Sequence, residues 1–382
     1  MPVLLAAMAL ATAGCGGDGG GDRDRGGPPT TAAPTTADRT ATTATSPRSP
    51  TTATAREAVR RLPVAVDRRV ELLSILFRLA GAPPYPQAAT PYARAVDGWF
   101  GRWRDDPAVA ATRALVAGGI AYDGPIQLAV QLDDRGRLAV PRADLDPRWR
   151  SVDVARYLTL VRRFARRADL DGFLRGQRDY AAAVVDADRR RLADRPILDW
   201  YERLLGRRPG ARYAVAPGLL SGGHSFSARG HEGQAVLLVL FLEAPDAAGV
   251  PRPTDASVEF LAHELAHSWV NPIVAAATGR LRPAAEPAFR RVAEAMRRQA
   301  YPTPRIMVEE AVVRALTVLF LRDRVGADAA ARSLAEQQRL GFAWTPALVD
   351  ALDRLRRADG GRLDPDAAVA ATARVLRAWT AG

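Results

Sequence analysis

The chain has 382 residues, 48% of them hydrophobic, which is enough for one large domain or two ordinary domains with a buried core. Its formal net charge of +12 would ordinarily suggest a nucleic acid or an anionic membrane as partner. All 54 basic residues are arginine, however, and acidic residues are interspersed among them, as around Arg189–Arg191. With abundant Ala, Gly and Pro, this pattern favours compositional bias and a solvated charged surface, so we expect no nucleic-acid partner.

Residues 1–15 have the pattern of an export signal. Val3–Ala11 is an apolar run too short to span a bilayer, and two small residues precede Cys15, the only cysteine. This arrangement resembles a bacterial lipobox, although no basic residue precedes the run and Thr12 stands where Leu is usual. We therefore expect an exported, cell-surface lipoprotein that is attached to the membrane through a lipid anchor on Cys15 rather than a transmembrane helix. The alternative is a cleaved signal and a secreted protein.

Residues 16–55 form a segment of Gly, Asp, Arg, Thr, Ala, Pro and Ser with almost no large apolar side chains. Such a composition cannot bury enough surface to offset the entropy lost on ordering. We expect a disordered tether there and one ordered domain over 56–382. Within this domain we expect an N-terminal helical lobe at 56–206 and a catalytic part at 207–382.

Helices are expected through most of the first half of the ordered domain. Apolar residues recur at helical spacing over 70–80, and similar patterns cover 90–104 and 107–118. The run Ile126–Leu132 indicates a strand, and a charged helical block follows at 152–206.

Strands are expected at Tyr213–Ala216, Leu219–Ala228 and Ala235–Leu242, the last suited to a sheet interior. From Asp255 the pattern is helical to the end, with breaks expected at Gly279, Pro302/Pro304, Gly326 and Gly360. The expected fold class is therefore α+β, mainly helical with a small sheet before the helices of the second half.

The segment His263-Glu264-Leu265-Ala266-His267 is an HExxH motif. In a helix that starts near Asp255 and is bent or interrupted at Asn271-Pro272, the two histidines lie on one face and can bind one tetrahedral ion. Glu264 projects about 100° away, where it can serve as general base for a zinc-activated water. We therefore predict His263 and His267 as zinc ligands and Glu264 as the catalytic base.

Two features argue against a chance match to this motif. The chain has only four histidines, and the surrounding helix is apolar on nearly every side. Buried polar side chains without partners are costly, and a Zn²⁺ ion would supply the partner.

A catalytic zinc with an open position requires a third protein ligand. No third histidine follows closely, but an apolar helix over 306–321 contains Glu309, Glu310 and Arg314. Glu310 and Arg314 are four residues apart and can pair, so we predict Glu310 as the ligand and Arg314 as its outer support. Glu309 is the alternative ligand, or faces a ligand histidine or the substrate. A buried Glu310–Arg314 ion pair without metal is the structural alternative.

Other candidate groups flank these two helices. His224 lies in a Gly-rich segment that can form a sheet edge binding extended substrate, where it can stabilise an oxyanion. The Gly-Gly pair can equally mark a bulge or turn, and His224 or His231 can simply be exposed. Tyr301 and Tyr213 are further hydrogen-bond donor candidates. Asn271 is expected in the outer shell of the metal.

Several segments together resemble a bacterial domain-of-unknown-function family with an HExxH metallopeptidase motif. They are VELLSILFRLAG (70–81), PYARAVDGWFGRW (91–103), AYDGPIQLAVQL (121–132), LLSGGHSFSAR (219–229), HELAHSWVNP (263–272) and EEAVVRA (309–315). The resemblance covers about 60–380, although His224 stands where Asn or Tyr is expected. It implies a zincin-like metallopeptidase fold and a gluzincin-like scheme with His263, His267 and Glu310 as ligands and Glu264 as base.

The expected function is that of an exported zinc-dependent metallohydrolase. The favoured class is a peptidase that acts on peptide or protein substrates. The alternative is a surface lipoprotein that binds peptide or wall polymer and has a structural or catalytically inactive zinc site. The intact Glu264 favours the enzyme, because a structural zinc site needs no base at that position.

Overall fold

The computed structural model describes residues 60–382, except 231–234, 242–245, 247–249 and 251–253. The expected signal segment with Cys15, the tether at 16–55 and His231 lie outside the described residues. The described chain is mainly helical with one small sheet, which confirms the α+β class. Within it, no helix is long and apolar enough to cross a membrane.

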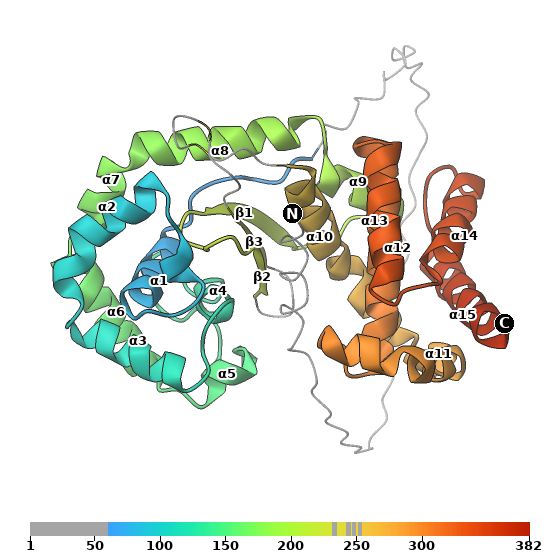
Figure 1. Ribbon diagram of the computed structural model, residues 1–382, viewed down its shortest axis with the longest axis horizontal. Coiled ribbons are helices and arrows are strands. Elements are labelled where there is room, and N and C mark those ends of the chain that lie inside the picture. Colours follow the sequence, from blue (N-terminus) through green and yellow to red (C-terminus); the bar gives the residue numbers. More distant parts are fainter. Residues whose placement is uncertain (1–59, 231–234, 242–245, 247–249, 251–253) are drawn as a thin grey trace, which may run out of the picture. The chain divides into compact units, whose positions relative to one another are not determined.

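The helices before the sheet confirm most of the expected elements (Figure 1). They are α1 (Arg68–Leu79), α2 (Pro91–Phe100), α3 (Pro107–Ala117), α4 (Gly124–Ala129), α5 (Pro147–Arg150), α6 (Val154–Arg167), α7 (Leu170–Gly176), α8 (Arg178–Ala193) and α9 (Ile197–Leu205). Local sequence explains several starts: the side chains of Asp67, Thr90 and Asp106 accept hydrogen bonds from the first turns of α1, α2 and α3. Proline is also the first residue of α2 and α3, where its missing N–H has no cost.

The expected strand at Ile126–Leu132 is wrong, because most of this segment forms α4. Pro125 lies in the first helical turn, where its fixed φ favours a helix. A short apolar run does not distinguish a buried helix from a buried strand, so periodicity alone misassigned it. Only Leu132 forms an isolated bridge, with Leu138.

The sheet consists of β1 (Arg212–Gly218), β2 (Phe226–Arg229) and β3 (Ala235–Phe241) in the order β1-β3-β2. β3 is central, parallel to β1 and antiparallel to β2. The expected strand at Leu219–Ala228 is mostly turn, because only its last three residues belong to β2. Gly222 has a φ of +59°, and a Cβ there would lie 2.2 Å from the Pro84 carbonyl oxygen, so the turn requires glycine.

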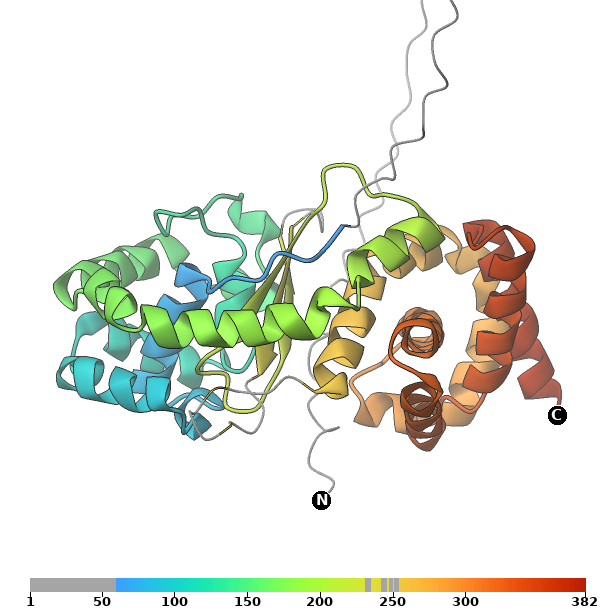
Figure 2. The same cartoon turned by 90° about the horizontal axis from the view of Figure 1, so that it is seen from above.

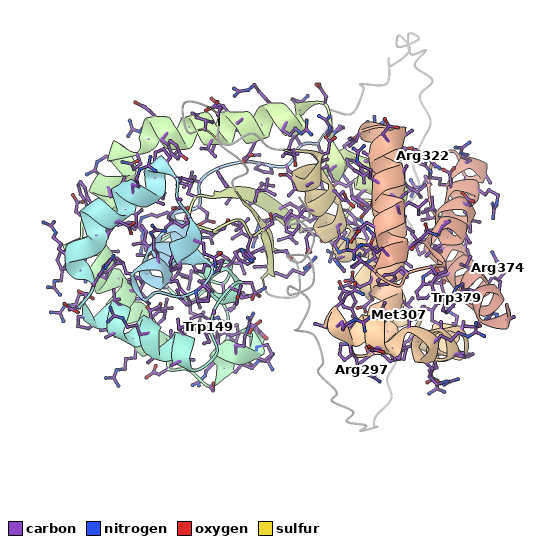
Figure 3. All side chains as sticks on the ribbon, viewed as in Figure 1. Trp149, Arg297, Met307, Arg322, Arg374 and Trp379 are labelled. Atoms are coloured by element: carbon purple, nitrogen blue, oxygen red, sulfur yellow. The ribbon has the colours of Figure 1, made fainter. Side chains whose placement is uncertain are left out.

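Side chains of β3 alternate between two hydrophobic cores. Val236, Leu238 and Leu240 pack with α9 and the helices after the sheet, whereas Leu237 and Val239 pack with most of the helices before it. The sheet therefore lies between two helical layers (Figures 1 and 2). Figure 3 shows Trp149 within the first layer and Met307 within the second.

The helices after the sheet are α10 (Asp255–Ala276), α11 (Thr278–Arg298), α12 (Pro304–Arg324), α13 (Ala327–Arg339), α14 (Thr345–Ala358) and α15 (Pro365–Ala381). The breaks expected at Pro302/Pro304, Gly326 and Gly360 are confirmed, and the break expected at Gly279 occurs two residues earlier, at Ala277 between α10 and α11. Thr254 rather than Asp255 caps α10. The expected interruption at Asn271-Pro272 is also wrong, because α10 continues past Pro272 to Ala276 and its central turns are fully packed.

Candidate metal centre

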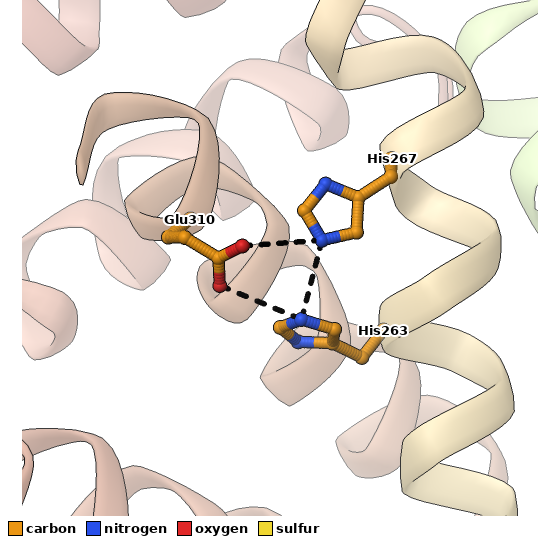
Figure 4. Close-up of side chains that lie close together, drawn as sticks. All are labelled: His263, His267 and Glu310. Atoms are coloured by element: carbon orange, nitrogen blue, oxygen red, sulfur yellow. Dashed lines mark hydrogen bonds and ion pairs between the residues drawn. The ribbon is translucent and has the colours of Figure 1, made fainter. Parts of the chain in front are cut away.

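Two buried helices present the candidate ligands to each other. His263 and His267 lie one turn apart on α10, and Glu310 lies on α12, which packs along α10. The three side chains are at most 5% exposed. Figure 4 shows both imidazole rings and the carboxylate pointing toward a common centre.

The distances within this group fit a tetrahedral ion. The two histidine Nε2 atoms are 3.3 Å apart. Nε2 of His263 lies 3.5 Å from Oε2 of Glu310, and Nε2 of His267 lies 3.3 Å from the other carboxylate oxygen, Oε1. A tetrahedral zinc ion with bonds of about 2.0–2.1 Å keeps its ligand atoms roughly 3.3–3.4 Å apart. The three residues therefore form a buried group that can hold a metal ion.

The Glu310 carboxylate gives an independent test of this fit. Within the described part of the chain, neither of its oxygens has a hydrogen bond of normal geometry, although both are buried. The nearest cationic atom, Arg314 Nε, is 3.3 Å from Oε2 and is itself without a hydrogen-bond partner there. An ionised carboxylate in this setting needs a cation, and an ion between the three ligands would provide it.

Burial and neighbouring charges shift the pKa values of the three candidate ligands. Burial would by itself raise the pKa of Glu310, but the charge of His267, with those of His263 and Arg314, holds this pKa well below its usual range. Burial lowers the pKa of His263 to about 4. Burial is the largest single influence on the pKa of His267 and lowers it, but the nearby carboxylates of Glu310 and Glu264 together raise this pKa above its ordinary value.

Outer contacts fix the orientation of the ligands. The Nδ1 atom of His267 is 2.9 Å from Oδ1 of Asn271, so an Nδ1–H donor there leaves Nε2 free for a metal. The guanidinium of Arg314 donates to Gln337 and, at 3.0 Å, to the Tyr301 hydroxyl. It also lies 4.6 Å from the centre of the Phe342 ring. Arg314 is therefore held in place behind Glu310.

Glu264 faces the sheet. Its Oε2 atom accepts a hydrogen bond from the Ser227 hydroxyl and lies 3.9 Å from Arg229 Nη1. Arg229 Nη2 donates to the Glu264 main-chain oxygen at 2.7 Å. Three of these contacting residues were not predicted from the sequence. They are Ser227 and Arg229, which are two positions apart on β2, and Gln337 on α13. The period of two within β2 is the only sequence signal that pairs Ser227 with Arg229.

Among the described residues, the remaining candidates are not members of the three-residue metal group. His224 has Nδ1 3.2 Å from the Gly222 oxygen, and its ring lies near the rings of Tyr122 and Phe226. Tyr301 is 1% exposed and contacts Arg314. Glu309 is 3.8 Å from Arg305 and outside the three-residue metal group. Catalytic roles for His224 and Tyr301 stay predictions.

The outer edge of β2 is already occupied. Gln127 and Gln131 donate from their side-chain amides to the main-chain oxygens of Ser227 (2.9 Å) and Arg229 (3.0 Å). An extended substrate could pair with this edge, as expected for the Gly-rich segment, only by displacing these amides.

Comparison with known proteins supports a family and no more. The model of a family described as a domain of unknown function (DUF4932) matches residues 107–359. This span runs from α3 to α14 and includes His263, Glu264, His267 and Glu310. No curated protein and no solved structure matches the chain.

Proposed function

The chain belongs to the DUF4932 family of domains of unknown function, and we propose that it is a zinc metallohydrolase that cleaves peptide bonds. One observation carries the proposal. A buried two-histidine, one-carboxylate triangle with tetrahedral spacing lies beside a glutamate that is not one of its members. Two histidines and a carboxylate make a ligand set that zinc enzymes use for catalysis.

His263, His267 and Glu310 would hold the ion through Nε2 atoms and carboxylate oxygens. A bound zinc ion supplies a Lewis acid, which polarises a carbonyl and makes water easier to deprotonate. Asn271 orients His267, and Arg314, whose Nε lies 3.3 Å from Oε2 of Glu310, supports the charge of that carboxylate.

Glu264 has the role of proton carrier. It is 4% exposed, next to His263 in sequence but directed toward β2. As general base it accepts a proton from the attacking water, and it then delivers this proton to the nitrogen of the leaving amine. This transfer leaves a carboxylic acid and an amine as products and restores the carboxylate of Glu264.

The alternative is a peptide- or polymer-binding lipoprotein with a structural zinc. Structural zinc sites are usually closed by four protein ligands, whereas three residues make up this group in the described chain. The donor set therefore favours the enzyme.

The proposal is tested by measuring the zinc content and peptide cleavage of the purified full chain. We expect about one zinc per chain in both the wild type and Glu264→Gln, and cleavage of a mixed peptide library by the wild type. General-base catalysis contributes about 10²–10⁴-fold to rate, so Glu264→Gln is expected to lose at least that much activity. Glu286→Gln, an exposed change on α11, is the matched control and should cleave normally.

Stoichiometric zinc with no cleavage by the wild type would reject the peptidase and favour the binding lipoprotein. Cleavage by Glu264→Gln at the wild-type rate would reject Glu264 as the base while leaving the metal site intact.

We also propose export and a lipid anchor on Cys15, on sequence grounds alone. In a bacterial host, wild-type chain should incorporate labelled fatty acid and partition into the detergent phase, whereas Cys15→Ser should do neither. Equal partitioning of the two proteins would exclude the anchor.

A further inference from the structure

In the described part of the chain, the hydrogen bond and the ion pair of the Glu264 carboxylate both come from β2. Among the described residues, Oε2 of Glu264 takes the hydroxyl hydrogen bond of Ser227 and the 3.9 Å approach of Arg229, and no hydrogen bond reaches Oε1. One carboxylate oxygen is thus held, and the other is left for proton transfer. Arg229 also donates to the main-chain oxygen of Glu264, so it ties the backbone and the side chain of this residue to β2.

The strand that makes these contacts is fixed on both sides. Its inner edge pairs with β3, with Ser227 opposite Leu238 and Arg229 opposite Val236. Its outer carbonyl oxygens accept from Gln127 and Gln131. Gln127 lies within α4, and Gln131 lies in the turn just after it. The two amides reach the carbonyl oxygens of alternate residues of β2, which are roughly 6.7 Å apart along a strand.

Helix α4, which contacts β2, is itself held by side chains of α5. The indole of Trp149 donates to the Gly124 oxygen at 2.9 Å, and Arg148 forms a two-pronged ion pair with Asp123 just before α4. Trp149 is fully buried. Movement of β2 would therefore break contacts on both of its edges. A rigid support of this kind is what a catalytic group needs, since a displacement of 1 Å can cost about 100-fold in rate.

Ser227 and Arg229, which both contact Glu264, differ in charge and in exposure to solvent. Ser227 is 1% exposed, so its hydroxyl has no solvent to bind and its donor is directed at Glu264. The side chain of Arg229 is 31% exposed. It contributes a charge close enough to influence His267 as well. Ser227 therefore sets the position of the carboxylate, and Arg229 links it to the strand.

We propose that Ser227 and Arg229 are positioning residues that hold the Glu264 carboxylate with Oε1 directed to its proton-transfer role. The inference rests on the proposed function of Glu264. It predicts that the two residues affect turnover rather than metal binding or substrate affinity, because neither belongs to the metal group.

The first test is structural and independent of activity. Crystal structures of the zinc-loaded wild type, Ser227→Ala and Arg229→Met would show the place of the Glu264 carboxylate. We expect one conformer bonded to Ser227 in the wild type, and a displaced or split carboxylate in both variants. Ser268→Ala, which removes another buried hydroxyl from the motif helix, is the matched control and should leave Glu264 in place.

The second test is kinetic. Ser227→Ala should retain full zinc content and a KM within about twofold of the wild type, while kcat falls about 10–100-fold, the range for outer partners of catalytic groups. Ser227→Thr keeps the hydroxyl and suits a strand, so it should restore kcat. Arg229→Lys keeps the charge but not the forked donor, and should restore it only in part.

Different results would contradict the positioning role of Ser227 and Arg229 and the proposed peptidase activity. A carboxylate that stays in place in both Ser227→Ala and Arg229→Met overturns the positioning role, whatever the activity. A wild-type chain that holds zinc and cleaves nothing, but whose Glu264 shifts only in these variants, overturns the peptidase and leaves the positioning role standing. A loss of zinc in Ser227→Ala also contradicts the inference.

Discussion

At the scale of single residues, two adjacent glutamates of α12 differ in the groups that they contact. Glu310 and Glu309 are neighbours in sequence, yet they point to different surroundings. Glu310 meets both histidines and Arg314, whereas Glu309 lies near Arg305. A helix separates adjacent side chains by about 100°, which is why two adjacent carboxylates have different environments.

This difference gives a prediction for metal binding. Glu310→Ala removes a ligand and should weaken zinc binding by more than the roughly 100-fold seen for outer partners, whereas Glu309→Ala should retain about one zinc per chain. Competition with a chromogenic chelator measures both affinities. Equal zinc affinity in the two variants would contradict the ligand assignment.

Asn271 provides a second prediction at this scale. Asn271→Ala removes the acceptor that orients the His267 ring, and we expect zinc affinity to fall about 10–100-fold. Asn271→Asp retains an acceptor and should bind within about tenfold of the wild type. The same chelator competition tests both variants, and an unchanged affinity in Asn271→Ala would show that the ring needs no such support.

At the scale of elements, α1 contains a buried carboxyl remote from the metal. Glu71 is 1% exposed and accepts a hydrogen bond from the Tyr92 hydroxyl at 2.6 Å. Burial raises the pKa of Glu71 to about 8, the Tyr92 hydrogen bond opposes this, and the charge of Asp67 adds to it. The folded protein therefore holds a proton that the unfolded chain releases between about pH 4.5 and pH 8.

The raised pKa of Glu71 makes the free energy of unfolding depend on pH. The stabilisation by protonated Glu71 is complete below about pH 4.5 and is lost as pH rises through 8, because the unfolded state binds fewer protons in that window. Glu71→Gln should remove this loss and be more stable than the wild type at pH 8 by on the order of a few kcal/mol. Urea denaturation at pH 5, 6.5 and 8 measures the difference, with the exposed Glu286→Gln as control. Parallel pH profiles for Glu71→Gln and the wild type would contradict it.

The contact between α4 and β2 is also an element-scale feature. Gln131 is 3% exposed, and its amide covers the Arg229 carbonyl. Leaving that acceptor without a partner should cost about 1–3 kcal/mol in Gln131→Ala. The exposed Gln338→Ala on α13 should stay within about 0.5 kcal/mol of the wild type in the same chemical denaturation. A Gln131→Ala protein as stable as the control would show that the edge of β2 needs no cap.

At the scale of the whole molecule, the sheet joins two cores. Leu237 and Leu238 are adjacent and buried, but they pack on opposite faces of the sheet. Each Leu→Ala change should cost about 2–5 kcal/mol. Because β3 belongs to both cores, both variants should show one shifted transition in circular dichroism and tryptophan fluorescence. Separate transitions in one variant would show that the two cores unfold independently.

Much of this protein could be predicted from local sequence, because the signals are local. The spacing of His263 and His267 on one helical face follows from 3.6 residues per turn. Caps such as Asp67 and Thr90 indicate where helices start, and the continuous apolar run of β3 indicates an interior strand. Ile126–Leu132 was misassigned, because a short buried apolar run has no periodicity that separates helix from strand.

Other features were decided only by the tertiary structure. Glu310 lies 43 positions beyond His267, and only the packing of α12 along α10 brings its carboxylate within 3.5 Å of both imidazoles. The strand order β1-β3-β2 places β2 at the edge of the sheet, where Ser227 and Arg229 meet Glu264 and Gln127 and Gln131 cover the outer carbonyls. The sequence by itself determined that His263 and His267 share one helical face next to Glu264, since helical geometry is local. The approach of Glu310 to both histidines, and of Ser227 and Arg229 to Glu264, depends on contacts between distant segments.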